Sequence, residues 1–270
     1  MNITFIGGGN MASALISGLL QQSYAAGQLH VVEINAENRE KIKHTLGIPA
    51  VADLADGVKG SDVILLTVKP QQLFELTQKL APLLNNQLII SIAAGIRATD
   101  IIRWLGGYAR VVRAMPNTPS LVRSGVAGLY AAPGVGELDK KNAESILAAV
   151  GTTLWVNDEE MLHAVTAISG SGPAYVFYFI ESMQQAGIEL GLTPIQARQL
   201  SLQTFAGASK LASLSDEDVA VLRARVTSKG GTTEQAIQTM EKNAIQCKII
   251  AAVHAANRRS RELSDEFSRI

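Results

Sequence analysis

The residues best placed to do chemistry form a glycine turn near the start of the chain. The triplet Gly7-Gly8-Gly9 directly follows an apolar run, and Asn10-Met11-Ala12 opens a helical pattern. In this Gly-x-Gly-x-x-Ala spacing, the first glycine permits a tight turn and the second lets the backbone approach a pyrophosphate. The alanine keeps the helix close to the strand. The free N–H groups at the helix start favour an anion. We therefore predict that this segment binds a nicotinamide dinucleotide.

The next candidate residues lie at the end of the second apolar run. Glu33 lies about twenty residues beyond Ala12, where an acidic side chain can bind the hydroxyls of the adenine ribose, and Asn35 is close by. This placement favours NAD. Glu33 can also be a solvated charge at a strand end, and Arg39 can instead meet a 2′-phosphate. Both NADH and NADPH therefore stay candidate cofactors.

The elements that position these residues alternate in type along the first half of the chain. Short runs rich in Val, Ile and Leu are separated by helical patterns, which is typical of crossover-connected parallel strands. The runs are nearly continuous, as expected for a doubly wound sheet covered by helices on both faces. We expect strands at 3–6, 31–34, 63–68, 88–92, 111–114, 126–130 and 153–156. A helical stretch at 137–150 precedes the last of them, and only helices follow Asn157.

Composition limits the function classes. The chain has 270 residues, with 24 Lys plus Arg against 24 Asp plus Glu, so its net charge does not suggest nucleic acid or an acidic membrane surface as a partner. Cys247 is its single cysteine, which suits a reducing compartment, and no apolar run approaches a membrane span. We expect a cytoplasmic protein with a small substrate. The four histidines lack metal-ligand spacing, so we expect no metal.

Three further loops follow predicted strands at their carboxyl ends, where open parallel sheets bind ligands. They are Val68-Lys69-Pro70, Ala93-Ala94-Gly95 and Met115-Pro116-Asn117-Thr118-Pro119. Pro70 also suits a helix start. In the helical half, Ser169-Gly170-Ser171-Gly172-Pro173 interrupts what would be a long helix. Tight helix packing and a substrate wall both explain that interruption.

A glycine pair in the helical half also precedes a helix. Gly230 and Gly231 lie in the segment 226–233, just before a helix N-terminus, whose free N–H groups make an anion site sized for a carboxylate. Thr232 or Thr233 can equally cap the helix. The two interpretations are compatible.

Taken in order and spacing, these motifs resemble pyrroline-5-carboxylate reductase over essentially the whole chain. The Ser-Gly-Ser-Gly-Pro-Ala-Tyr segment at 169–175 and the Thr-Ser-Lys-Gly-Gly-Thr-Thr segment at 227–233 are the most specific. The resemblance implies an α/β N-terminal Rossmann domain at 1–157 and an all-helical dimerisation and substrate domain at 158–270. It also implies NAD(P)H-dependent reduction of Δ1-pyrroline-5-carboxylate to L-proline. The Ala-rich helical half independently favours a homodimer or a higher assembly of dimers.

The resemblance also implies roles for individual residues. The nicotinamide is expected near Lys69-Pro70 and Ala93 to Gly95, and the substrate carboxylate on the backbone of Gly230 to Thr232. Thr233 is expected to face the nitrogen of the pyrroline ring of the substrate. Glu159 and Ser171 are expected in the substrate pocket, although Glu159 also suits the acidic first turn of its own helix.

Two alternative functions stay open. A β-hydroxyacid dehydrogenase-like oxidoreductase also joins a Rossmann domain to a helical one, but it needs a lysine base on the interdomain helix, and residues 161–185 contain none. A non-catalytic dinucleotide sensor would bind the cofactor without turning it over. The glycine and threonine loop argues against the sensor.

Overall fold

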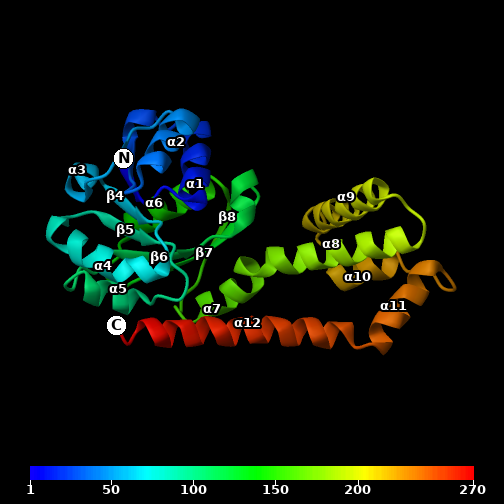
Figure 1. Cartoon of the computed structure of the whole chain (residues 1–270). Helices are drawn as coiled ribbons and strands as arrows, with labels where there is room; N and C mark the ends of the chain where they lie inside the picture. Colours follow the sequence, from blue (N-terminus) through cyan, green and yellow to red (C-terminus); the bar gives the residue numbers. More distant parts are fainter. The chain divides into compact units, whose positions relative to one another are not determined.

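The computed structural model describes all residues 1–270, which form two compact units (Figure 1). One unit comprises Met1–Ser171 together with Ala256–Ile270, and the other comprises Gly172–Ala255. The sequence predicts a boundary between residues 157 and 158 that separates a dinucleotide-binding domain from a helical domain. This functional boundary stays a prediction. None of the helices is both long and apolar enough to span a membrane.

An eight-stranded sheet forms the centre of the first unit, in the order β3-β2-β1-β4-β5-β6-β7-β8. All neighbouring strands are parallel except β6 and β7, which are antiparallel. This topology confirms the doubly wound α/β class. The strands are β1 (Ile3–Ile6), β2 (Leu29–Val32), β3 (Ala50–Val51), β4 (Val63–Leu66), β5 (Leu88–Ser91), β6 (Val111–Met115), β7 (Gly125–Ala131) and β8 (Gly151–Trp155).

Helices bury both faces of this sheet. One core includes side chains of α1 (Asn10–Gln21), α2 (Ala36–Leu46) and α6 (Glu137–Ala148). The other includes side chains of α3 (Leu54–Val58), α4 (Pro70–Leu80) and α5 (Ala98–Trp104). Because successive side chains of a strand point to opposite faces, Phe5 joins the first core and Ile6 the second. Burial on both sides accounts for the continuous apolar runs.

The expected strands are all present, but most of their boundaries differ from the expected ones by one or two residues, and one additional strand appears. The strand β2 begins at Leu29 and ends at Val32, where its pairing with Ile6 of β1 also ends. Glu33 therefore lies beyond the strand, in the connection to α2. The two-residue strand β3 was not expected, because so short an element shows no periodicity.

The helical segment begins with a widened turn. The helix α7 (Met161–Val165) leads into the π-helical turn η4 (Thr166–Gly170), and α8 (Gly172–Glu189) follows. The Ser-Gly-Ser-Gly-Pro segment thus distorts the helical path without a long break. The remaining helices are α9 (Pro194–Ser213), α10 (Val219–Arg225), α11 (Thr232–Lys242) and α12 (Ile245–Phe267), and the short 3-10 helices are η1 (Ala26–Gln28), η2 (Ala81–Leu83) and η3 (Thr118–Val122).

A close approach at Gly18 gives a test of the packing between α1 and the end of α6. A Cβ atom at Gly18 would lie 2.5 Å from the carbonyl oxygen of Ala149 and 2.8 Å from Cγ1 of Val150. Overpacking of this kind costs about 1–3 kcal/mol, against a gain of about 1 kcal/mol in helix propensity. We expect Gly18→Ala to lower the free energy of unfolding, measured by urea denaturation. The control Gly27→Ala, where a Cβ meets no atom within 4 Å, should change it little. A Gly18 variant as stable as the native chain would contradict this packing.

Candidate active site

The glycine turn after β1 is held from both sides by neighbouring strands. Gly7 adopts a φ of +103°, a left-handed conformation that favours glycine. Its N–H donates to the carbonyl of Val32 at 2.8 Å, and its own carbonyl accepts from Oγ1 of Thr67 at 2.7 Å. The turn is therefore fixed between the ends of β2 and β4.

The two glycines after this turn have different surroundings. A Cβ atom at Gly8 would lie 2.3 Å from Cδ1 of Ile42 and 3.2 Å from Oε2 of Glu33, whereas a Cβ at Gly9 would meet nothing within 4 Å. Gly9 precedes α1 and supplies no side-chain cap. The N–H groups of the first turn, which begins with Asn10 and Met11, are thus left for an anion.

A cleft of about 660 Å³ opens beside the glycine turn. Most of the predicted cofactor-binding residues line it, namely Gly7, Gly8, Gly9, Glu33, Asn35, Val68 and Lys69. Pro70 is the first residue of α4, which fits its interpretation as a helix start. The segment Ala93-Ala94-Gly95 follows β5 and is not part of this lining. The size and lining of the cleft suit a dinucleotide, and the individual roles stay predictions.

The carboxylate of Glu33 is aimed at the glycine turn. Its Oε2 accepts the N–H of Gly8 at 3.0 Å, and its Oε1 accepts the N–H of Asn35 at 2.8 Å. Asn35 in turn caps α2, with its side chain accepting the N–H of Asn38 at 2.9 Å. The Arg39 guanidinium donates to the backbone carbonyls of Glu33 and Ile34, each at 2.9 Å. At this position the chain thus presents a carboxylate, while the nearby arginine binds the backbone.

An ion pair between a buried arginine and a partly buried glutamate contacts the start of α5, which follows the β5–α5 loop. Oε1 of Glu159 accepts the N–H of Ala98 at 2.6 Å and pairs with Nη1 of Arg113 at 2.7 Å. The two side chains are only 16% and 7% exposed. Burial lowers the pKa of the Arg113 guanidinium, and the adjacent Glu159 carboxylate opposes that shift. Because α7 begins at Met161, Glu159 does not lie in the first turn of its own helix and instead caps α5.

The end of α12 lies beside α5, close to the marked C-terminus in Figure 1. Arg97, just before α5, donates to Oδ1 of Asp265 at 2.7 Å and to Oγ of Ser268 at 2.9 Å. The same Ser268 hydroxyl donates to Oδ2 of Asp100 at 2.6 Å. The Arg97 guanidinium lowers the pKa of Asp265. These contacts join the chain end to the start of α5.

A buried histidine also connects this region to α12. Nδ1 of His163 is 2.8 Å from Oγ of Ser260, and burial lowers the pKa of the imidazole.

Ser171, a predicted substrate-binding residue, follows the π-helical turn, and its N–H donates to the carbonyl of Thr166 at 2.8 Å. Asn117 bridges that turn to β7, donating to the carbonyl of Ser169 at 3.1 Å and accepting the N–H of Val126 at 2.9 Å.

The loop predicted to bind the substrate carboxylate belongs to the other compact unit. Gly230 has a φ of +73°, and its N–H donates to Oε2 of Glu234 at 2.7 Å. The N–H of Gly231 donates to the carbonyl of Ser228 at 3.0 Å. Thr232 and Thr233 are the first residues of α11, and no side chain caps this helix. Neither Thr232 nor Thr233 therefore caps the helix with its side chain. The roles of these residues toward a substrate stay predictions.

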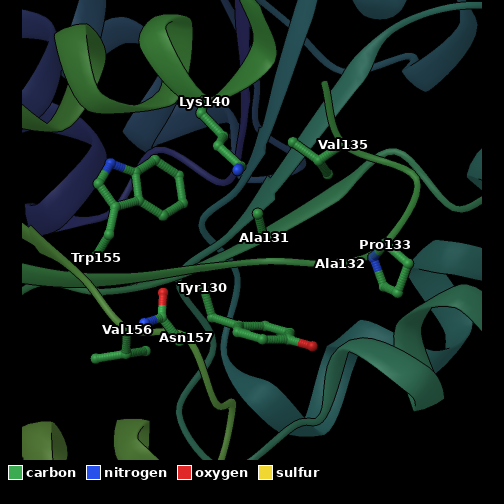
Figure 2. A pocket seen from close by; sticks show the side chains of 9 residues that line it. All are labelled: Tyr130, Ala131, Ala132, Pro133, Val135, Lys140, Trp155, Val156 and Asn157. Atoms are coloured by element: carbon green, nitrogen blue, oxygen red, sulfur yellow. The ribbon is translucent and has the colours of Figure 1, made fainter. Parts of the chain in front are cut away.

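A second hollow, of about 300 Å³, lies where β7 and β8 end. Because β7 runs antiparallel to β6, this hollow is at the edge of the sheet opposite the carboxyl ends of β1 and β4. Figure 2 shows Lys140 and Trp155 on one side of β7 and the Tyr130 ring on the other.

Comparison with known proteins decides the family. The chain is 46% identical to pyrroline-5-carboxylate reductase of Pseudomonas aeruginosa over 98% of this chain and 97% of that protein. It belongs to the pyrroline-5-carboxylate reductase family. Residues 159–263 match the model described as pyrroline-5-carboxylate reductase dimerisation, and residues 2–95 match one described as NADP oxidoreductase, coenzyme F420-dependent.

Solved structures of this reductase family share the fold. A pyrroline-5-carboxylate reductase from Coxiella burnetii superimposes with a TM-score of 0.93 at 42% identity, covering 97% of this chain and 98% of that one. The Plasmodium falciparum pyrroline carboxylate reductase, solved with NADP bound, superimposes with a TM-score of 0.88 at 29% identity, covering 98% of each chain. The expected combination of a Rossmann sheet and a helical dimerisation segment is thereby confirmed.

The placement of Glu33 predicts how the site selects its dinucleotide. A carboxylate beside the glycine turn can accept hydrogen bonds from ribose hydroxyls and repels a 2′-phosphate. We expect Glu33→Ala to lower the ratio of NADH affinity to NADPH affinity about ten-fold or more, in line with the loss of one charge-assisted hydrogen bond and of a like-charge repulsion. Dissociation constants from titration of cofactor fluorescence measure this ratio. The matched control is Glu37→Ala, an exposed carboxylate in the first turn of α2. An unchanged ratio in the Glu33 variant would mean that Glu33 does not contact the adenosine half.

Proposed function

We propose that this chain reduces Δ1-pyrroline-5-carboxylate to L-proline with NADPH or NADH, the last step of proline biosynthesis. The observation that carries the proposal is the full-length relationship to pyrroline-5-carboxylate reductases. The cleft beside the glycine turn supports it, because its position at the carboxyl ends of β1, β2 and β4 suits a dinucleotide.

The residues of the cleft would bind and orient the reactants. A reduced nicotinamide ring supplies a hydride to C5 of the cyclic imine, and the imine nitrogen ends protonated as the amine of proline. The N–H groups at the start of α1 would hold the pyrophosphate, and Glu33 the adenosine ribose. Val68, Lys69 and the loop at Ala93 to Gly95 would direct the nicotinamide half toward β4 and β5. Alignment of donor and acceptor is then the main contribution of the protein.

The backbone of Gly230 to Thr232 is proposed to bind the substrate carboxylate. In this structure the N–H of Gly230 donates to Oε2 of Glu234 at 2.7 Å, so the substrate carboxylate would have to replace that of Glu234. The hydroxyl of Thr233 would then hydrogen-bond the ring nitrogen and help it receive a proton. Ser171 stays a predicted substrate-binding residue. So does Glu159, whose Oε1 already binds the N–H of Ala98 and the Arg113 guanidinium.

The proposed assembly is a homodimer or a higher assembly of dimers. The match of residues 159–263 to a dimerisation model supports it. In this proposal residues 1–157 bind the dinucleotide, and residues 158–270 form the dimerisation and substrate domain. The substrate is a small molecule, and the location is the cytoplasm.

The direct test of the proposed activity is an absorbance assay of the purified chain. We expect NADH or NADPH to be oxidised when Δ1-pyrroline-5-carboxylate is added, and L-proline to accumulate in equal amount. Parallel runs with the two cofactors also test the preference expected from Glu33. Binding of cofactor without oxidation would favour a dinucleotide sensor. Oxidation of a β-hydroxyacid by NAD(P)⁺, with no reaction of the imine, would favour the β-hydroxyacid dehydrogenase alternative.

The proposed role of Thr233 predicts a selective loss of turnover. Thr233→Ala should lower kcat about ten-fold or more and leave dinucleotide affinity nearly unchanged, because one positioned hydrogen bond to the reacting nitrogen is lost. Steady-state kinetics and cofactor titration measure the two effects separately. Thr239→Ala is the matched control, since Thr239 lies on the same helix and donates to the carbonyl of Gln235 at 2.9 Å. Native kinetics in the Thr233 variant would remove this residue from the mechanism.

A further inference from the structure

The loop between β5 and α5 is anchored at several points. Gly95 has a φ of +78°, and a Cβ there would lie 3.1 Å from Cβ of Leu263. The N–H of Ala93 donates to Oγ of Ser91 at 3.3 Å, and Arg97 is tied to Asp265. At the far end of the loop, the first N–H of α5 is bound by the Glu159 carboxylate. Each of these contacts restricts the path of residues 92–97.

The anchor at Ala98 involves a charged pair that is less exposed than the pair of Arg97 with Asp265, at 7% and 16% against 26% and 61%. Arg97, at the N-cap position of α5, makes no side-chain cap bond, so Glu159 supplies the acceptor from a distant part of the chain. Arg113 on β6 holds that carboxylate through the same oxygen. A buried carboxylate is retained only where a partner compensates its desolvation, and here both an N–H and a guanidinium do so.

The sheet order places this loop opposite the adenosine side of the cleft. The glycine turn follows β1, which lies between β2 and β4, and Glu33 follows β2 on one flank. A dinucleotide with its pyrophosphate at the turn and its adenosine toward β2 must extend its other half toward β4 and β5. The loop at 92–97 lies at the carboxyl end of β5.

We propose that Glu159, held by Arg113, is a positioning residue that fixes the β5–α5 loop and thereby the nicotinamide half of the bound dinucleotide. Glu159 acts through the N–H of Ala98 and touches neither the adenosine half nor the pyrophosphate. This inference rests on the proposed function only in that the chain binds NADH or NADPH.

The test compares two ligands that share the adenosine half. Titrations with NADH and with ADP-ribose, which lacks the nicotinamide, are carried out on the full chain and on Glu159→Ala. We expect the affinity for NADH to fall at least five-fold, and that for ADP-ribose to stay within two-fold. Glu159→Gln, which keeps an acceptor for the N–H of Ala98, should restore part of the loss. Glu160→Gln is the matched control, since that neighbouring carboxylate pairs with Arg261 and His163 instead.

A second variant keeps the test decisive if loss of Glu159 alone destabilises the fold. Replacing both partners, Arg113→Met with Glu159→Leu, removes the cap without leaving a buried charge unpaired. The same selective loss of NADH affinity is expected there. Unchanged affinity for both ligands, or an equal loss of both, would overturn the proposal. So would a rise in KM for the imine alone, which would place Glu159 against the substrate. A native chain that binds NADH but does not reduce the imine would refute the proposed function without affecting this comparison.

Discussion

The left-handed turn at Gly7 is the constraint on which the arrangement of the candidate site depends. A Cβ atom there would lie 3.0 Å from the backbone oxygen of Thr67, so a side chain at this position would be crowded by the end of β4 as well as strained by the φ of +103°. The turn lies at the carboxyl end of β1, which pairs in parallel with β2 and β4. Glu33 and Lys69 therefore emerge at the same edge of the sheet as the start of α1. One local conformation thus brings together a helix N-terminus, a carboxylate and two loops around one cleft.

Around this rigid turn, the flanking loops depend on polar contacts that join distant segments. Apolar packing on both faces of the sheet holds the strands, and the β5–α5 loop shares in it through Ala93 and Ile96, which belong to the second core. The Glu159 carboxylate and the end of α12 add polar contacts to this loop. The helix α12 begins in one compact unit and ends in the other. It carries part of the match to the dimerisation model, and its end contacts Arg97 of the β5–α5 loop.

The sequence predicted most of the sheet and the cleft lining, because those features have local signatures. Continuous apolar runs mark strands buried on both faces, and the glycine spacing marks the turn. The contacts that lack a local pattern were missed. Glu159 and Ala98 are 61 residues apart, and Arg97 and Asp265 are 168 apart, so no window of sequence shows that they meet. The sequence predicted an interruption of the helix at 169–173, because Gly and Pro have low helix propensity. The structure instead has a π-helical turn, and the helical path continues through it. Tertiary contacts such as that of Asn117 with Ser169 accompany this turn.

In the proposed reaction, the dinucleotide bound at the glycine turn delivers its hydride directly to the imine carbon. The most direct measurement uses NADH or NADPH carrying deuterium on one face of C4 of the nicotinamide, with mass spectrometry of the proline that forms. We expect one of the two C4 stereoisomers to give one deuterium per proline, located at C5. Proline without deuterium from both C4 stereoisomers of the labelled cofactor, or no proline at all, would contradict it.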